Sequence, residues 1–252
     1  MKLKVIGHRG APIDRPENTL ESFELALAQG ADGVELDVRL SAEEELVIWH
    51  DPVLRQGAGS ELGIHELSVS NLRGIDLTAA TDHEVWSDPT HICTLSEVLD
   101  LAAGALVDIE LKNLPGEPLA DFEHRLSRLV TDLITEAEVV DDVVVTSFWP
   151  EALDAINDVA PTIATGWLLI PGVSPLRVLD EAAAKGYSLL LPFDTSLNLD
   201  SEPEVFDRVR DVGIETWTWT VNDPERMKAL IDKGIDGIIT DSPALAVEVL
   251  GR

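Results

Sequence analysis

Seven charged or titratable residues stand out because each lies within or directly after a short apolar run. They are His8, Arg9, Glu35, Asp37, His50, Glu110 and Lys112. Glu35 and Asp37 are two residues apart, so they would share one face of a strand. Three clustered carboxylates repel one another and need a cation, and all-oxygen ligation suits Mg²⁺ or Ca²⁺. The alternatives are a carboxylate network without metal, or exposure of one of the three at the surface.

The cations and histidines beside these carboxylates suit phosphate chemistry. Arg9 and Lys112 either balance the carboxylates or bind the oxygens of a phosphate group. Histidine changes its charge near neutral pH, so His8 and His50 suit a general acid and a general base. Together these residue types predict metal-assisted cleavage of a phosphate ester bond.

The elements that must position these residues alternate between short β-rich runs and amphipathic helical stretches. We expect strands at residues 4–7, 33–38, 106–111, 143–148, 163–169, 188–191, 215–221 and 237–240. We expect helices at residues 20–29, 95–102, 119–137, 151–159, 175–185, 203–212, 224–233 and 243–250. Eight βα units in 252 residues predict an α/β protein with a closed (β/α)8 TIM barrel. The alternative is a doubly wound open sheet, which the absence of Gly-x-Gly-x-x-Gly after the first strand weakens.

A ninth β-like run, at residues 45–49, begins soon after the second expected strand. A parallel crossover needs about a dozen residues, so this run is expected to return antiparallel. Such a hairpin arm would carry His50 and Asp51 back toward the mouth of the barrel. Residues 52–93 are rich in Gly, Ser, Asp and His. We expect them to form a small irregular insertion over the mouth, within a single domain spanning residues 1–252.

Composition and charge restrict the partners of this chain. Asp and Glu number 47 against 18 Lys and Arg, a net charge of −29. Such a surface repels nucleic acid and anionic membranes, so we expect neither as a stable partner. The scattered acidic residues form solvated helix faces or an adaptation to salt. With one cysteine, Cys93, and no signal-peptide pattern, a cytoplasmic protein is expected, and no oligomeric state is predicted.

Taken in order, the motifs resemble the glycerophosphodiester phosphodiesterases almost from end to end. The matching segments are His8-Arg9-Gly10, Pro16-Glu17-Asn18-Thr19, Glu35-Leu36-Asp37-Val38, His50-Asp51-Pro52, Thr94-Leu95-Ser96-Glu97-Val98-Leu99, Glu110-Leu111-Lys112, Trp219-Thr220-Val221-Asn222-Asp223 and Gly237-Ile238-Ile239-Thr240-Asp241-Ser242-Pro243. The resemblance implies a (β/α)8 barrel with a small insertion. It also implies hydrolysis of glycerophosphodiesters, dependent on a divalent metal, to glycerol 3-phosphate and an alcohol.

Residue by residue, the resemblance implies metal ligation by the three carboxylates, acid–base roles for the two histidines and phosphate contacts by the two cations. Trp219 and Phe148 either line a glycerol pocket or fill the barrel. Glu17 and Asn18 either order the first βα loop beside the site or cap a helix. The family usually has a Thr-x-Asp-Gly turn where this chain has Ser-Ala-Glu-Glu-Glu at residues 41–45, a change in the hairpin turn and not in the ligands.

Two other functions compete with this one. The first is a phosphodiesterase acting on lysophospholipids or another phosphodiester, which would prefer an apolar or basic rim. The insertion is instead polar and acidic, with Trp86 its only large aromatic residue. The second is a non-catalytic barrel that binds phosphorylated ligands, which is disfavoured because all seven polar residues are present. We therefore expect a small-molecule glycerophosphodiester with a soluble headgroup as the substrate.

Overall fold

Eight parallel strands close into a barrel. The structure is a computed structural model that describes residues 3–56, 60–77, 88–117 and 119–252. In these ranges the strands pair in the order β1-β11-β10-β9-β8-β7-β6-β2, and β1 also pairs with β2, which closes the ring. The predicted (β/α)8 barrel is therefore confirmed. The bounds are β1 (Lys4–His8), β2 (Gly33–Leu40), β6 (Leu106–Leu111), β7 (Val143–Ser147), β8 (Ala164–Leu169), β9 (Leu189–Pro192), β10 (Glu215–Thr218) and β11 (Gly237–Thr240).

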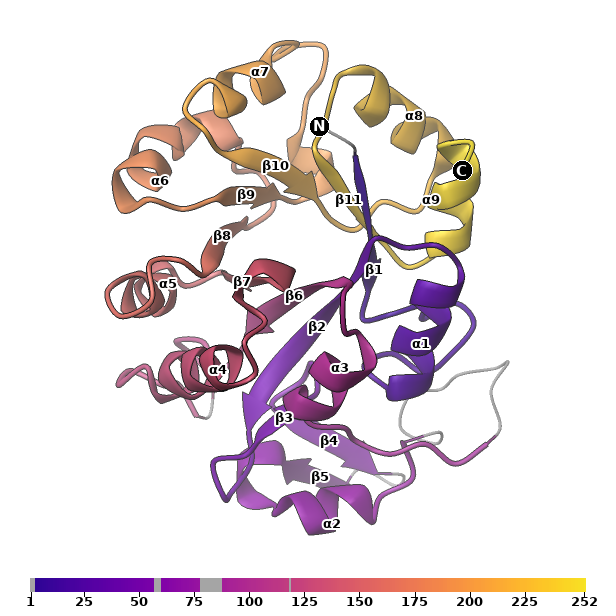
Figure 1. Cartoon of the computed structure of the whole chain (residues 1–252), viewed down its shortest axis with the longest axis vertical. Coiled ribbons are helices and arrows are strands. Elements are labelled where there is room, and N and C mark those ends of the chain that lie inside the picture. The colour runs from indigo at the N-terminus through magenta and orange to yellow at the C-terminus, as the bar shows by residue number, and fades with distance from the viewer. Residues whose placement is uncertain (1–2, 57–59, 78–87, 118) are drawn as a thin grey trace.

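Helices surround the barrel on its outside (Figure 1). They are α1 (Leu20–Ala28), α3 (Leu95–Leu101), α4 (Arg125–Glu136), α5 (Pro150–Asn157), α6 (Leu179–Lys185), α7 (Val205–Arg210), α8 (Pro224–Asp232) and α9 (Pro243–Val249). Local sequence fixes their starts. Thr94 and Glu97 form a capping box at α3, because the side chain of each accepts a hydrogen bond from the backbone N–H of the other. Proline occupies the first turn of α8 and α9, where its missing N–H costs no helical hydrogen bond.

Alternation along β2 and β6 decides which side chains face the barrel interior. Val34, Leu36 and Val38 of β2 belong to the apolar layer shared with the helices, so the residues between them point inward. Residues 107, 109 and 111 of β6 follow the same rule. The two strands are parallel neighbours, with Asp37 level with Glu110. The inward positions of both strands therefore bring acidic side chains side by side.

Two of the helical predictions need correction. The helix expected at residues 119–137 begins at Arg125, because Asp121 and His124 belong to a loop. The Asp121 carboxylate accepts a hydrogen bond from the backbone N–H of Leu126, and His124 takes a left-handed φ of 53° at the helix start. The helix expected at 175–185 is divided into a short 3₁₀ helix, Pro175–Arg177, and α6.

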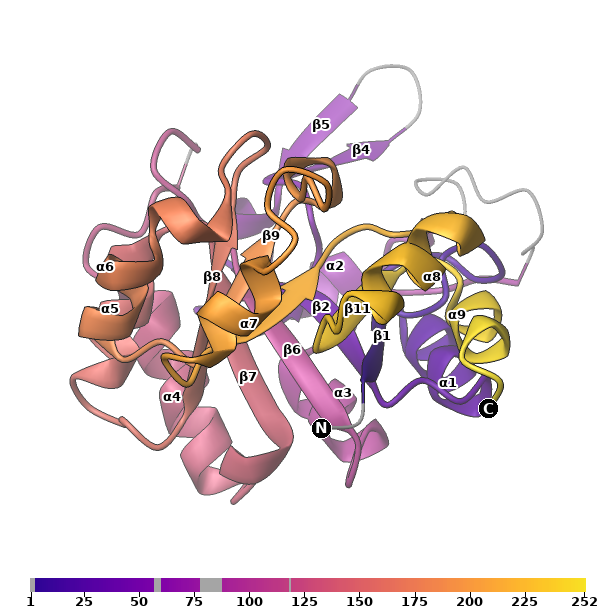
Figure 2. The same ribbon diagram turned by 90° about the horizontal axis from the view of Figure 1, so that it is seen from above.

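The run after β2 returns antiparallel as β3 (Leu46–Ile48), as predicted. In the turn between them Glu44 has a φ of 60°, a conformation that glycine adopts more easily. The expectation of an irregular insertion is wrong, because β4 (Val53–Gln56) and β5 (Ser60–Gly63) form a second sheet and α2 (Val69–Arg73) follows. These elements lie beside β3 at one side of the barrel (Figures 1 and 2).

The insertion has an apolar cluster that depends on the hairpin. Its buried members are Val47, Trp49, Leu54, Ile64, Leu72, Leu77 and Ile92. Two of these come from the β3 segment, so the insertion completes its core against the barrel's own hairpin. Residues 57–59 and 78–87, which include Trp86, lie outside the described ranges. That the insertion covers the mouth within a single domain stays a prediction. Along the described part of the chain, no helix has both the length and the apolar character needed to cross a bilayer.

Candidate active site and metal centre

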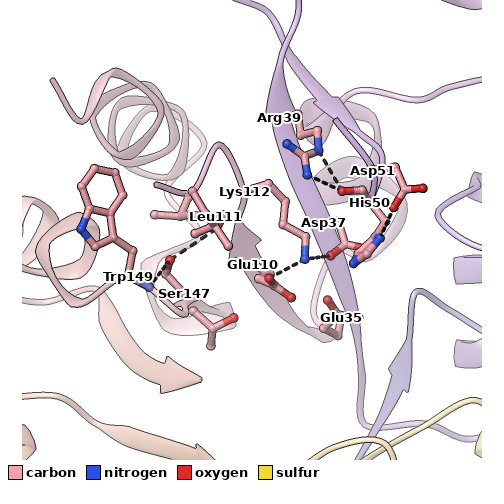
Figure 3. Close-up of polar contacts among 12 residues, drawn as sticks. Glu35, Asp37, Arg39, His50, Asp51, Glu110, Leu111, Lys112, Ser147 and Trp149 are labelled. Atoms are coloured by element: carbon pink, nitrogen blue, oxygen red, sulfur yellow. Dashed lines mark hydrogen bonds and ion pairs between the residues drawn. The ribbon is translucent and has the colours of Figure 1, made fainter. Parts of the chain in front are cut away.

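Three buried carboxylates from β2 and β6 meet inside the barrel. Glu35, Asp37 and Glu110 each offer an oxygen atom, and these atoms lie within 4.8 Å of one another. Figure 3 shows the three side chains pointing toward one space from the two neighbouring strands. The structure thus brings together all three residues that the sequence predicts as metal ligands. Their oxygen donors and negative charge suit a hard divalent cation.

Two cations compensate part of this charge. The Lys112 Nζ atom lies 3.0 Å from Asp37 Oδ1 and 2.5 Å from Glu110 Oε1, and Arg9 Nε lies 3.0 Å from Asp37 Oδ2. Burial alone would raise the pKa of Asp37, but Lys112 and Arg9 hold it well below its usual range. Glu35 has its pKa raised well above the ordinary value by burial and by the neighbouring carboxylates. The cluster therefore still carries uncompensated negative potential around Glu35.

The loop between β1 and α1 contacts this carboxylate cluster, and two of its residues have a backbone conformation that is rare for residues other than glycine. Arg9 and Asn18 have left-handed φ angles of 53° and 58°. The Arg9 backbone N–H donates to Glu35 Oε2 at 2.9 Å, and the Asn18 amide donates to Asp37 Oδ2 at 2.8 Å. Glu17 Oε1 accepts from Arg9 Nη1 at 2.9 Å. The loop therefore gains specific contacts with the carboxylates that offset the cost of its strained backbone.

The two histidines that the sequence predicts lie on the same cavity, each with one ring nitrogen held by a carboxylate. His8 Nδ1 is 2.6 Å from Asp241 Oδ1, and the amide of Asn222 donates to the other Asp241 oxygen at 2.5 Å. His50 Nδ1 is 2.7 Å from Asp51 Oδ1. Burial alone would raise the pKa of Asp241, but its bond to His8 holds it below the ordinary value. With Nδ1 engaged, Nε2 is the atom through which each ring can exchange a proton with a ligand.

Aromatic side chains line the other wall of this cavity. It has a volume of about 190 Å³, and its lining includes both histidines, Phe148 and Trp219. The rings of Phe148 and Trp219 meet edge to face with centroids 5.4 Å apart. Trp217, by contrast, is fully buried, and a side chain at Gly237 would collide with its ring. The structure therefore places Trp219 at the wall of the cavity and Trp217 in the packed interior.

Sequence reasoning missed Asp108, which lines the same cavity and is fully buried. Its Oδ1 accepts a hydrogen bond from Thr146 at 2.7 Å, and its Oδ2 has no hydrogen-bond partner among the described residues. Burial raises the pKa of Asp108 to about 8, despite the bond from Thr146. A signal existed, because Asp108 stands two residues before Glu110 and therefore shares its face of the strand. Asp241 was also missed as a partner of His8, since 233 residues separate them in sequence.

Residues 8–245 match the Glycerophosphoryl diester phosphodiesterase family. The chain belongs to this family. A glycerophosphodiester phosphodiesterase of Caldanaerobacter subterraneus subsp. tengcongensis is 30% identical, over 100% of this chain and 99% of that one. Another, from Bacillus altitudinis, is 29% identical over 98% and 97% of the two chains. The resemblance that the motifs indicate is therefore confirmed.

Solved structures agree with this assignment. The glycerophosphodiester phosphodiesterase of Thermotoga maritima superposes with a TM-score of 0.78 at 28% identity, covering 99% of both chains. A phosphodiesterase of Oleispira antarctica, solved with the product sn-glycerol-3-phosphate, superposes with a TM-score of 0.83 at 23% identity, covering 99% of this chain and 97% of that one. At the lower identity the likeness shows the shared fold alone. As a member of the glycerophosphoryl diester phosphodiesterase family, the chain is an enzyme that hydrolyses phosphoric diesters, and a non-catalytic role is set aside.

Proposed function

We propose that this enzyme hydrolyses glycerophosphodiesters to glycerol 3-phosphate and an alcohol, with a divalent cation held by Glu35, Asp37 and Glu110. The observation that carries the proposal is the meeting of three carboxylates, two cations and two histidines around one cavity. A phosphodiester needs all three kinds of group, because its charge must be neutralised and protons must move at two oxygens.

The net charge of the cluster supports a divalent ion at this site. Glu35, Asp37 and Glu110 contribute three negative charges when ionised, and Arg9 and Lys112 contribute two positive charges. The residual negative charge would repel a phosphodiester, whereas a bound Mg²⁺ or Ca²⁺ would reverse its sign. The donor set consists of oxygens alone, which is the set that both ions prefer. When bound, the ion would neutralise charge that develops on the phosphoryl oxygens.

The side chains of the enzyme supply the remaining steps. Arg9 and Lys112 line the cavity with their charged ends near the carboxylates, where they orient the phosphodiester. One of the two histidines takes a proton from the nucleophile through Nε2, and the other donates a proton to the oxygen of the leaving alcohol. The nucleophile is water, which gives glycerol 3-phosphate directly, or the 2-hydroxyl of the glycerol moiety, which displaces the alcohol to give a cyclic phosphate that water must then open. A substrate that lacks the 2-hydroxyl distinguishes them, because only the water route would hydrolyse it at an undiminished rate.

The direct test is a panel of assays with the purified enzyme. Glycerophosphocholine, glycerophosphoethanolamine and a lysophospholipid are each offered with Mg²⁺, with Ca²⁺ and with a chelator. We expect rapid release of glycerol 3-phosphate from the two soluble diesters, and loss of that activity in the chelator. Undiminished hydrolysis in the chelator would contradict the metal site.

The assignment of the histidines has its own test. In His8→Ala and in His50→Ala, kcat is expected to fall by about 10²- to 10⁴-fold, with the melting temperature little changed. His91 offers a matched control, because it is an exposed histidine of the insertion. His91→Ala should keep the activity of the natural enzyme. Near-normal turnover in either site variant would show that the altered residue has no acid–base role.

One observation favours lysophospholipids as a second substrate class. Ile13, Phe122 and Ile170 have exposed fractions of 56%, 68% and 60%, and all three follow barrel strands β1, β6 and β8. They therefore lie on loops at the end of the barrel that holds the site, where an acyl chain would emerge. A higher kcat/KM for the lysophospholipid than for glycerophosphocholine would favour this class.

A further inference from the structure

Arg39 makes a contact that the proposed chemistry does not yet use. It lies on β2, two residues beyond Asp37, and its side chain is only 3% exposed. Its Nε and Nη2 atoms donate to the backbone oxygen of His50 at 2.8 Å and 2.5 Å. Figure 3 shows the guanidinium group beside the segment that carries His50. A buried arginine thus holds the main chain of a residue whose ring lines the cavity.

The adjacent edge of the guanidinium group, formed by Nη1 and Nη2, is fixed as well. Glu117 accepts from Arg39 Nη1 at 2.8 Å and from Nη2 at 3.0 Å, so the pair is bidentate. The Leu114 backbone N–H donates to Glu117 at 3.1 Å, which anchors this carboxylate in the loop after β6. Burial alone would raise the pKa of Glu117, but its bonds from Arg39 hold it below the ordinary value. The guanidinium plane is therefore set by two bonds on each side.

His50 needs such support more than His8 does. His8 ends a barrel strand that pairs with neighbours on both sides, whereas His50 follows β3, a strand of three residues. The side chain of Asp51, which holds the His50 ring, is 46% exposed. A general acid or base must stay within hydrogen-bond reach of its proton partner, so movement of this short arm would lower the rate.

We propose that Arg39 is a positioning residue that fixes the His50 segment at the cavity, and that Glu117 orients Arg39 for this task. The inference rests on the proposed role of His50. Arginine suits the position because its planar fork can bridge a carbonyl and a carboxylate at once. The ammonium group of lysine cannot reproduce both pairs of bonds.

The central experiment is a double-mutant cycle with kcat as the readout. In Arg39→Met we expect kcat to fall by about 10- to 100-fold, with KM changed by less than about threefold. In His50→Ala the added Arg39→Met change should cost less than about twofold, because no imidazole remains to be positioned. Additive losses in the double variant would show that Arg39 acts independently of His50 and would overturn the inference.

A second, milder variant separates the loss of positioning from a general loss of folding. Glu117→Gln leaves Arg39 in place and removes one charge, so we expect a smaller loss in kcat, of about 3- to 10-fold. Rate loss in Arg39→Met with full activity in Glu117→Gln would refute the role of Glu117. Divalent-ion affinity, measured by calorimetry, should be unchanged in both variants, since neither residue contacts the proposed ligands. Weaker ion binding would mean that Arg39 acts through the neighbouring Asp37 instead.

The chain offers a matched control for this network. Arg125 and Glu44 form another arginine–glutamate pair, with 2.6 Å between Nη2 and Oε2, that joins the β2–β3 turn to the start of α4. This pair is exposed and makes no described contact with His50. Arg125→Met should keep normal kcat, and an equal loss there would refute the specific role of Arg39. If His50→Ala itself retained full turnover, the proposed function would fail and not merely this inference.

Discussion

Replacing Asp108 by asparagine tests whether burial in the barrel keeps this carboxyl group protonated near neutral pH. Asp108 is fully buried, and one of its oxygens has no hydrogen-bond partner among the described residues. Asparagine has nearly the same shape and can still accept the bond from Thr146, but it cannot ionise. The substitution therefore removes a proton equilibrium while changing the packing little.

The size of the effect follows from the pKa of about 8 for Asp108, against an ordinary value of 3.8. Between these values the folded protein keeps the Asp108 proton and the unfolded chain loses it, so unfolding releases a proton. The free energy of unfolding must then fall as pH rises through this window and level off above about pH 8. One proton corresponds to about 1.4 kcal/mol per pH unit, or about 4 kcal/mol from pH 5 to pH 8. Relaxation of the protein around the ionised carboxylate would reduce this fall in unfolding free energy. We therefore expect Asp108 to contribute a fall of at least about 2 kcal/mol between pH 5 and pH 8.

The measurement is urea unfolding of the natural enzyme and of Asp108→Asn at pH 5 and pH 8, in chelator. The difference in unfolding free energy between the two proteins isolates Asp108, because all other groups titrate in both. We expect the variant to gain stability relative to the natural enzyme on going to pH 8. Asp141→Asn, which removes an exposed carboxylate, serves as the control and should show no such gain. A difference that does not change with pH would refute the reasoning.

Four further outcomes are expected. Asp241→Asn frees the His8 ring from its carboxylate, so kcat should fall by about 10²-fold or more, and an unchanged kcat would exclude that partnership. Lys112→Met removes one of the two cations that contact the buried carboxylates and should lower the free energy of unfolding by about 3–5 kcal/mol in chelator, measured in urea. Mg²⁺ or Ca²⁺ at about 100 times its dissociation constant should stabilise the natural enzyme by about 2.7 kcal/mol in thermal unfolding. The Glu110→Gln variant should not gain this stability, and equal stabilisation of both proteins would exclude Glu110 as a ligand. Because the net charge is −29, molar salt should raise the melting temperature, and a melting temperature that does not rise would argue against salt adaptation.

Much of the fold was predictable from short-range patterns. Apolar runs marked every barrel strand, because strands covered on both faces read as continuous hydrophobic segments. The short connection before residue 46 predicted an antiparallel return, since no crossover fits in it. The start of α4 was not predictable in the same way. Residues 119–124 look amphipathic, yet two hydrogen bonds hold them as a loop. The Asp121 carboxylate accepts from the backbone N–H of Leu126, and the Asp121 backbone N–H donates to the backbone oxygen of Asn113.

The sequence by itself determined that Glu35 and Asp37 share a strand face, because side chains alternate with a period of two. The order of the motifs further indicated the family, and the resemblance implied which carboxylates would bind a metal ion. Only the closed barrel decided which distant groups meet. Closure sets β1 beside both β2 and β11, so His8 meets Asp241 across 233 residues, and β2 beside β6, so Lys112 reaches Asp37. The contact of Arg39 with the backbone oxygen of His50 likewise depends on where the β2–β3 hairpin ends. Its contact with Glu117 depends on the path of the loop after β6. Such contacts depend on the three-dimensional path of the backbone, which local residue spacing does not encode.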